Sequence, residues 1–181
     1  MSFRGIYASI KKPDLNIDTD RKGRRMRIRR AKKQDIAGID RLLRQVLEVH
    51  HLGRPDLFLG KTKKYTDEQL EKIIRDDTRP VFVAAGEDEK ILGYAFCILQ
   101  QHIGDNILTD IKTLYIDDLC VDENERGRHI GRRLYDFVVV YAKKAGCYNV
   151  TLNVWACNEG AMKFYERCGL KMQKMGMEII L

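Results

Sequence analysis

One short segment constrains the fold of this chain more than any other. The run DENERGRHIGRRLY at 122–135 follows an apolar, β-forming stretch at 113–121 and enters a helical pattern that continues to about 145. The first turn of a helix exposes unpaired backbone N–H groups at the positive end of the helix dipole, and such a turn binds phosphate or pyrophosphate. The sequence therefore predicts a domain with strands and helices and an anion site where this strand passes into this helix.

The side chains of this turn fit an anion. Arg126, Arg128 and Arg132 add positive charge, and glycine at 127 and 131 lets the backbone approach a ligand closely. The turn is neither a P-loop nor a dinucleotide-binding glycine motif, since G-K-[ST] and G-x-G-x-x-G are both missing. A solvated, arginine-rich helix start without a ligand is the alternative reading. The candidate anion-binding residues are Arg126, Gly127, Arg128, His129, Ile130, Gly131 and Arg132.

Hydrophobic periodicity predicts the remaining elements. Strands are expected at 26–30, 81–86, 91–100, 113–121 and 149–155, helices at 33–49, 66–76, 130–145 and 158–169, and a last strand or strand pair at 170–181. The short connections make the middle strands antiparallel, and one strand-helix-strand crossover follows them. This order predicts a single mixed α/β (α+β) domain of three layers at 26–181.

Charge and composition limit the other possibilities. The net charge of +7 is concentrated in residues 1–25, where seven Lys and Arg face three Asp. These residues are predicted to be a flexible basic leader, which either docks on an acidic partner or is simply an extended start. Nucleic acid is an unfavoured partner because aromatic side chains do not interleave with the basic ones. We expect a cytoplasmic protein without a membrane span or a metal site, because no long apolar run and no C-x-x-C pair occur.

Two motifs give the chain a resemblance to a known family. The run from Arg126 to Gly131 resembles the pyrophosphate motif Q/R-x-x-G-x-G/A of GCN5-related N-acetyltransferases (GNAT), with His129 in place of the middle glycine. The run WACNEGAMKFYERCGL at 155–170 resembles the second motif of that family. Over 26–181 the resemblance implies the GNAT fold, a mostly antiparallel sheet splayed at the cofactor site, and acetyl-CoA as cofactor. Asn158, Ala161 and Tyr165 match the positions that follow the cofactor arm.

The resemblance also implies catalytic roles. Tyr165 would protonate the departing thiolate, and the backbone of Leu119, Cys120 and Val121 would hold the acetyl carbonyl and the pantetheine amides. The strand around Asp117 and Asp118 is similar to that of diamine acetyltransferases, which gives Asp117 the general-base position. Asp118 then holds a cationic substrate or caps the strand end. Neighbouring strand residues point to opposite faces unless the strand bulges, so a pair of solvated charges is the alternative.

The acceptor is the least constrained part of the prediction. Glu48 and His51 are substrate candidates by position alone. A polyamine or other small cationic amine is the first choice, and a protein N-terminus or lysine is the second. A non-catalytic acyl-CoA-binding regulatory domain on the same fold is the competing hypothesis. A homodimer is common in this family, and the apolar end GMEIIL either completes the sheet or pairs with a second subunit.

Overall fold

The computed structural model describes residues 18–19 and 25–181. Most of the predicted leader therefore lies outside the described residues. The strands are β1 (Asp18–Thr19), β2 (Arg25–Arg30), β3 (Val81–Gly86), β4 (Ile91–Gln101), β5 (Lys112–Val121) and β6 (Asn149–Leu152). The helices are α1 (Ile36–Gly53), α2 (Asp67–Arg75), α3 (Ile130–Lys144) and α4 (Glu159–Arg167), with short 3-10 turns at Lys33–Asp35 and Glu123–Glu125.

The strands form one sheet in the order of the sequence. Each strand from β1 to β4 pairs antiparallel with the next, and β5 pairs parallel with β6. The crossover from β5 to β6 passes through α3, as the sequence predicted. This arrangement confirms the mixed α/β fold of three layers.

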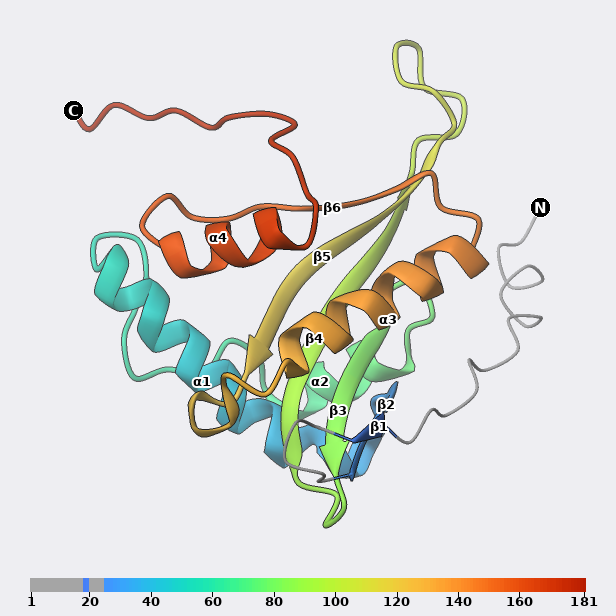
Figure 1. The fold of residues 1–181 in the computed structure, drawn as a ribbon. Coiled ribbons are helices and arrows are strands. Elements are labelled where there is room, and N and C mark those ends of the chain that lie inside the picture. The colour runs from blue at the N-terminus through green and yellow to red at the C-terminus, as the bar shows by residue number, and fades with distance from the viewer. Residues whose placement is uncertain (1–17, 20–24) are drawn as a thin grey trace.

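The helices cover both faces of the sheet (Figure 1). α1 and α2 pack on one face, where Ile39, Leu42 and Leu70 meet Val83 and other residues of the sheet. α3 packs on the opposite face, and α4 joins it there through partly buried side chains. The alternation along β3 serves both layers, because Val81 and Val83 face α1 while Phe82 faces α3.

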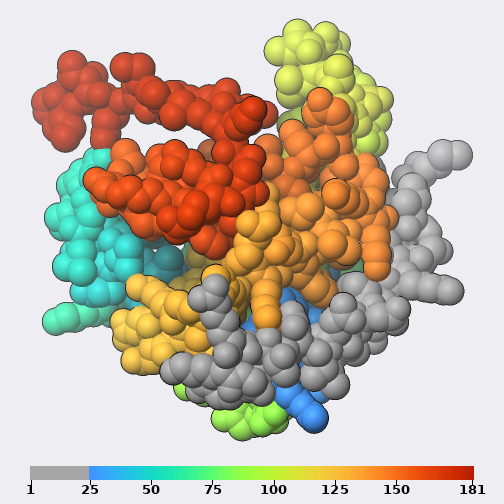
Figure 2. All heavy atoms as spheres, in the orientation of Figure 1, coloured from blue at the N-terminus to red at the C-terminus, as the bar shows by residue number. Residues whose placement is uncertain are grey.

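The predicted last strand is absent. Residues 171–181 are exposed and have no regular structure, and β6 ends at Leu152 instead of continuing to 155. Figures 1 and 2 show this C-terminal arm running past α4 and standing away from the body of the molecule. The apolar pattern of the arm suits a strand, but a strand needs a partner, and none of the described strands pairs with it. The prediction of a sheet-completing strand at 170–181 was therefore wrong.

In the part of the chain that the structure describes, no helix combines the length and the apolar character that crossing a bilayer requires. The cytoplasmic location stays a prediction.

A buried ion pair at the start of the domain offers a test of the fold. Arg29 on β2 donates from Nη1 to Asp35 Oδ2 over 2.6 Å, and both side chains are less than a tenth exposed. Replacing Asp35 with Ala leaves a buried guanidinium without its main counter-ion, so we expect a loss of about 3 kcal/mol in the free energy of unfolding. Urea denaturation followed by circular dichroism measures it. Glu159→Ala, which removes an exposed pair with Lys163, is the control and should cost less than about 0.5 kcal/mol.

Candidate active site

A β-bulge brings two carboxylates to one place. Along β5, Asp118 pairs with Phe96 and Ile116 pairs with Cys97, so Asp117 is an extra residue without a partner on β4. The bulge breaks the alternation of side chains, and the Oδ2 atoms of Asp117 and Asp118 both lie 3.3 Å from the Nζ of Lys64. An acid pair on one side of a strand therefore replaces the opposed pair that regular alternation would give.

Asp118 is the more buried member of the pair. Its side chain is 7% exposed, against 28% for Asp117. The hydroxyl of Tyr94, a fully buried residue on β4, donates to Asp118 Oδ2 over 3.2 Å. Burial raises the pKa of Asp118, while the ammonium of Lys64 opposes this rise. A carboxylate with a raised pKa is suited to accept a proton near neutral pH.

Tyr165 lies on α4, on the same side of the sheet as α3. It is partly buried and packs against the core between α3 and the sheet. Burial raises the pKa of its hydroxyl, and the negative charge of Asp118 raises it further. The phenol therefore keeps its proton at neutral pH and can donate it. The charge of Asp118, which the sequence analysis gave as a substrate-holding or strand-capping residue, therefore acts on the predicted acid Tyr165.

The outer edge of β5 is open beside these groups. Pairing with β6 ends at Ile116 and Leu152, so the strand from 117 to 121 has a hydrogen-bonded neighbour only on its β4 side among the described residues. The backbone of Leu119, Cys120 and Val121 lies along this open edge. An extended amide-bearing ligand can pair with such an edge as an added strand.

The turn after β5 is held by α1. Arg41 donates from Nη1 to Asp122 Oδ2 over 2.6 Å and from Nη2 to the carbonyl of Ile91 over 2.8 Å. Burial acts to raise the pKa of Asp122, but the hydrogen bond from Arg41 and others outweigh it and hold that pKa below its ordinary value. Gln45 accepts from the backbone N–H of Glu123. This clamp fixes the turn that leads into α3.

Two residues of the turn have left-handed backbones. Gly127 has a φ of 77° and His129 a φ of 60°. His129 stands where the resembling motif has its middle glycine, so this histidine adopts a conformation that glycine adopts more easily. Its side chain is exposed, as is that of Arg126. The turn therefore presents its backbone and Arg126 to solvent at the N-terminus of α3.

The other arginines of the turn are engaged with protein. Arg128 is 8% exposed and pairs with Glu125, which Lys90 also approaches. Arg132 pairs with Asp136 and also donates to the carbonyl of Arg167 at the end of α4. Ile130 is buried in the core, so it can meet an anion only through its backbone N–H. Gly131 lies against Phe164 of α4, where an added Cβ would be 3.5 Å from the ring.

Asn158 caps α4. Its Oδ1 accepts from the backbone N–H of Ala161 over 3.1 Å, which satisfies one of the unpaired donors of the first turn. Asn158, Ala161 and Tyr165 occur at spacings of three and four residues and so follow one side of α4.

Among the described contacts, neither of the two predicted acceptor residues, Glu48 and His51, contacts the acid pair. His51 is tied to its own loop, since its Nδ1 lies 2.7 Å from the carbonyl of Phe58. Glu48 is exposed on α1. For the neighbouring His50, burial lowers the pKa, and the charge of Asp118 acts in the opposite direction.

The sequence analysis missed a cluster of three rings, formed by His50, Phe58 and Trp155. The ring of Phe58 packs on His50 at 5.0 Å and on Trp155 at 5.2 Å between centroids. It joins the end of α1, the loop at 54–65 and the segment after β6. Alternating apolar residues could not signal it, because its members come from three segments that only the fold brings together.

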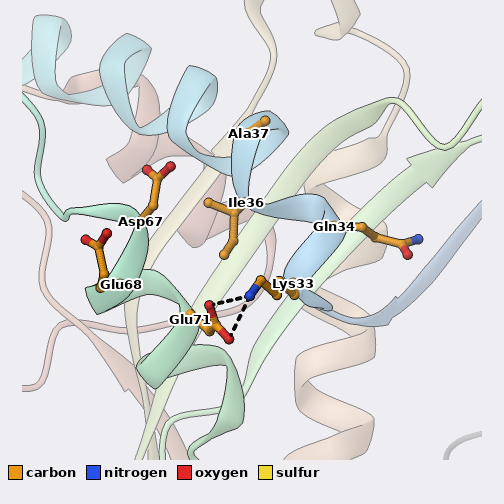
Figure 3. A pocket seen from close by; sticks show the side chains of 7 residues that line it. All are labelled: Lys33, Gln34, Ile36, Ala37, Asp67, Glu68 and Glu71. Carbon is orange, nitrogen blue, oxygen red and sulfur yellow. Dashed lines mark hydrogen bonds and ion pairs between the residues drawn. The ribbon is translucent and has the colours of Figure 1, made fainter.

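A separate pocket of about 310 Å³ lies between the start of α1 and α2 (Figure 3). Its polar lining includes an ion pair of Lys33 with Glu71 at 2.9 Å. None of its lining residues belongs to the predicted cofactor or acceptor set. Across the described residues, no three His, Cys, Asp or Glu side chains gather in a way that could hold a metal ion.

Comparison with known proteins defines the class to which this site belongs. The model of the acetyltransferase (GNAT) family matches residues 46–170, more than half of the chain. The chain therefore belongs to the GNAT family.

Particular relatives narrow the picture. Glucosamine 6-phosphate N-acetyltransferase 1 of Dictyostelium discoideum is 34% identical over 67 residues, which cover 37% of this chain and 41% of that protein. The crystal structure of a tetramutant of the BH1408 protein from Bacillus halodurans aligns with a TM-score of 0.81 and 34% identity over 85% of this chain and 99% of that one. The glucosamine-6-phosphate N-acetyltransferase structure from Arabidopsis thaliana aligns with a TM-score of 0.63 and 25% identity over 86% and 97%.

These comparisons correct one resemblance. The curated relatives from Dictyostelium discoideum and Arabidopsis thaliana are glucosamine 6-phosphate N-acetyltransferases and not the diamine acetyltransferases that the acceptor strand resembles. The matches to the first two curated relatives span only about two fifths of their length, 41% and 42%. The family is therefore established, and the acceptor is a separate question.

The left-handed histidine of the turn yields a prediction about stability. His129→Gly should raise the free energy of unfolding by about 0.5 kcal/mol, because relief of the αL strain exceeds the added freedom of glycine in the unfolded chain. Thermal and urea denaturation of both proteins measure the change.

The matched control is Glu123→Gly, at an exposed position of the same turn without a positive φ. That substitution should lower the free energy of unfolding by about 0.5–1 kcal/mol. Equal losses in both variants would show that the backbone of His129 carries no strain.

Proposed function

We propose that residues 26–181 form an acetyl-CoA-dependent N-acetyltransferase domain that acts on a primary amine. The observation that carries the proposal is the convergence of Asp117 and Asp118 on one ammonium, each 3.3 Å from Lys64 Nζ. A site that holds one alkylammonium between two carboxylates is built to recognise another. Membership of the GNAT family and the open edge of β5 beside the acid pair support the cofactor half of the proposal.

The cofactor would lie across the crossover. The backbone N–H groups of the turn at 126–131 and the side chain of Arg126 would bind the pyrophosphate at the N-terminus of α3. The pantetheine arm would pair with the open edge at Leu119, Cys120 and Val121, and Asn158 and Ala161 would border it from α4. Acetyl-CoA supplies the thioester that the amine attacks.

The protein groups would then move two protons. The acceptor arrives as an ammonium and must lose a proton before its nitrogen can attack. Asp118, whose pKa burial raises, or Asp117 beside it takes that proton directly or through water. Tyr165, which keeps its proton at neutral pH, gives it to the departing thiolate.

Two acceptor classes remain in contention. The acid pair favours a small cationic amine such as a polyamine. The named relatives favour a phosphorylated amino sugar, whose phosphate would need a positive partner near the acid pair, and Lys64 is such a residue. We favour the small cationic amine. Assays with a panel of diamines, amino sugars, amino sugar phosphates and peptides decide between the two classes.

Substitutions of the two catalytic groups test the mechanism. Tyr165→Phe should lower kcat by about 10² to 10⁴, the usual contribution of a general acid, with little change in CoA affinity. Asp118→Asn should lower kcat/KM and remove the acid-side inflection of its pH profile, because protonation of this carboxylate disables the base. Release of free thiol from acetyl-CoA measures the rates, and calorimetry measures CoA affinity.

Asp117→Asn is the matched control for Asp118→Asn, since it removes the same charge from the more exposed carboxylate. A loss of the inflection in Asp117→Asn alone would assign the base to Asp117. Full activity in Tyr165→Phe would contradict the acid role. Tight CoA binding without thiol release for any acceptor would support the non-catalytic, acyl-CoA-binding alternative.

We further propose a homodimer in which the C-terminal arm packs on a second copy of the chain. The arm exposes Met177, Ile179 and Ile180 by 80% or more, and β6 is an edge strand with a neighbour only in β5 among the described strands. Exposed apolar segments of this kind mark interaction surfaces. Within the described chain the arm is held by Arg54, which pairs with Glu178.

Truncation after Gly169 tests the dimer. Light scattering after size-exclusion chromatography should give a dimer for the full chain and a monomer for the truncated chain. Met177→Asp, which keeps the length, should also weaken the dimer because it places a charge in the apolar contact. A monomeric full chain at micromolar concentration would contradict the proposal.

A further inference from the structure

Lys64 pairs with the two carboxylates that the proposed function assigns to an acceptor amine. It comes from the loop between α1 and α2, and its ammonium lies between the two carboxylates with its side chain 34% exposed. The next residue, Tyr65, stacks on Phe96 at 6.0 Å between centroids, and Thr66 caps α2 through the backbone N–H of Gln69. The backbone that carries Lys64 is therefore anchored directly after it.

We propose that Lys64 is an internal acceptor, and that the protein acetylates the Nζ of its own Lys64 when no other amine occupies the site. This inference rests on the proposed function, because it uses the same acid pair, the same tyrosine and the same cofactor. It adds a modification site at a residue that lies outside the predicted catalytic and substrate residues.

The chemistry balances without a further reactant. The ammonium of Lys64 gives one proton to Asp118, and the neutral Nζ attacks the acetyl carbonyl of acetyl-CoA. A new C–N bond forms, the nitrogen loses its second proton to solvent, the C–S bond of the thioester breaks, and Tyr165 protonates the thiolate. When Tyr165 recovers the proton from Asp118 through solvent, the products are acetyl-Lys64, CoA and one proton released to solvent.

The position of Lys64 makes this reaction slower than turnover of a good acceptor. Burial lowers the pKa of Lys64, but the charges of Asp118 and Asp117 outweigh it and raise that pKa to about 12. The neutral form is therefore scarce at neutral pH. Proximity acts in the opposite direction, because an attached nucleophile has a high effective concentration.

Neighbouring lysines of the same loop are internal controls. Lys63 Nζ pairs with Asp40 and Asp67, at 3.5 and 3.3 Å, and so points away from the acid pair. Both lysines meet the same solution of acetyl-CoA. Uncatalysed acetylation therefore affects Lys63 as well as Lys64, whereas the catalysed reaction affects Lys64 alone.

Peptide mass spectrometry of the full chain tests the inference. After incubation with acetyl-CoA and no amine, Lys64 should gain one acetyl group at least about tenfold faster than Lys63, given the effective concentration of a tethered amine. Tyr165→Phe should slow modification of Lys64 and leave Lys63 unchanged. The rate should not depend on protein concentration, and an amine that the enzyme turns over should suppress it by competition for the acid pair.

Two results would overturn the inference. Equal rates at Lys64 and Lys63 would show that the modification is uncatalysed, as would a rate at Lys64 that Tyr165→Phe does not change. Thiol release with the amine panel, measured on the same preparation, separates the two proposals. Turnover of an amine with unmodified Lys64 refutes only the internal acceptor, whereas no thiol release and no modification refute the proposed function as well.

Discussion

The bulge at Asp117 is the constraint on which the rest of the site depends. A regular strand would send Asp117 and Asp118 to opposite faces of the sheet, one toward α1 and the other toward α3. The extra residue in β5 turns both carboxylates toward one ammonium. Pairing with β6 ends just before the bulge, at Ile116, so β5 has an open edge at the point where the carboxylates converge. A single local irregularity thus places an acid pair beside an extended docking edge.

Burial raises the pKa of Asp118, and it also imposes the free-energy cost of a buried charge. Tyr94 lies under Asp118 and donates to it, and the low exposure of that carboxylate raises its pKa. A buried charge needs a partner, and Lys64 supplies one from a different layer of the fold. An acceptor amine can replace Lys64 without leaving the carboxylates unpaired. Lys64 and an acceptor amine therefore compete for the same two carboxylates.

Much of this arrangement was predictable from sequence. Short-range patterns gave the order of the strands and helices, the turn at 122–131 and the cap at Asn158, because each depends on neighbours within a few residues. The bulge was foreseen only as the condition under which both carboxylates could face one cleft. His129 was noted only as a departure from the middle glycine of the motif, and its left-handed backbone was not predicted.

The remainder depends on contacts between distant segments. Lys64 meets Asp118 across 54 residues, and Arg41 meets Asp122 across 81, distances over which periodicity carries no signal. The charge of Asp118 acts on the pKa of His50, whereas His51, the predicted substrate residue, is bound to the carbonyl of Phe58 in its own loop. The arm at 170–181 has the composition of a strand, but only the fold reveals that none of the described strands receives it.

The central claim is that the acid pair binds an alkylammonium. Carbon-13 NMR of the Asp118 carboxyl in Lys64→Met, titrated with a primary amine, tests it most directly because the internal competitor has been removed. The account predicts that the carboxyl resonance shifts and saturates with the amine, and that wild-type protein needs a higher amine concentration for the same shift. A folded Lys64→Met protein whose Asp118 resonance ignores every amine in the panel would contradict it.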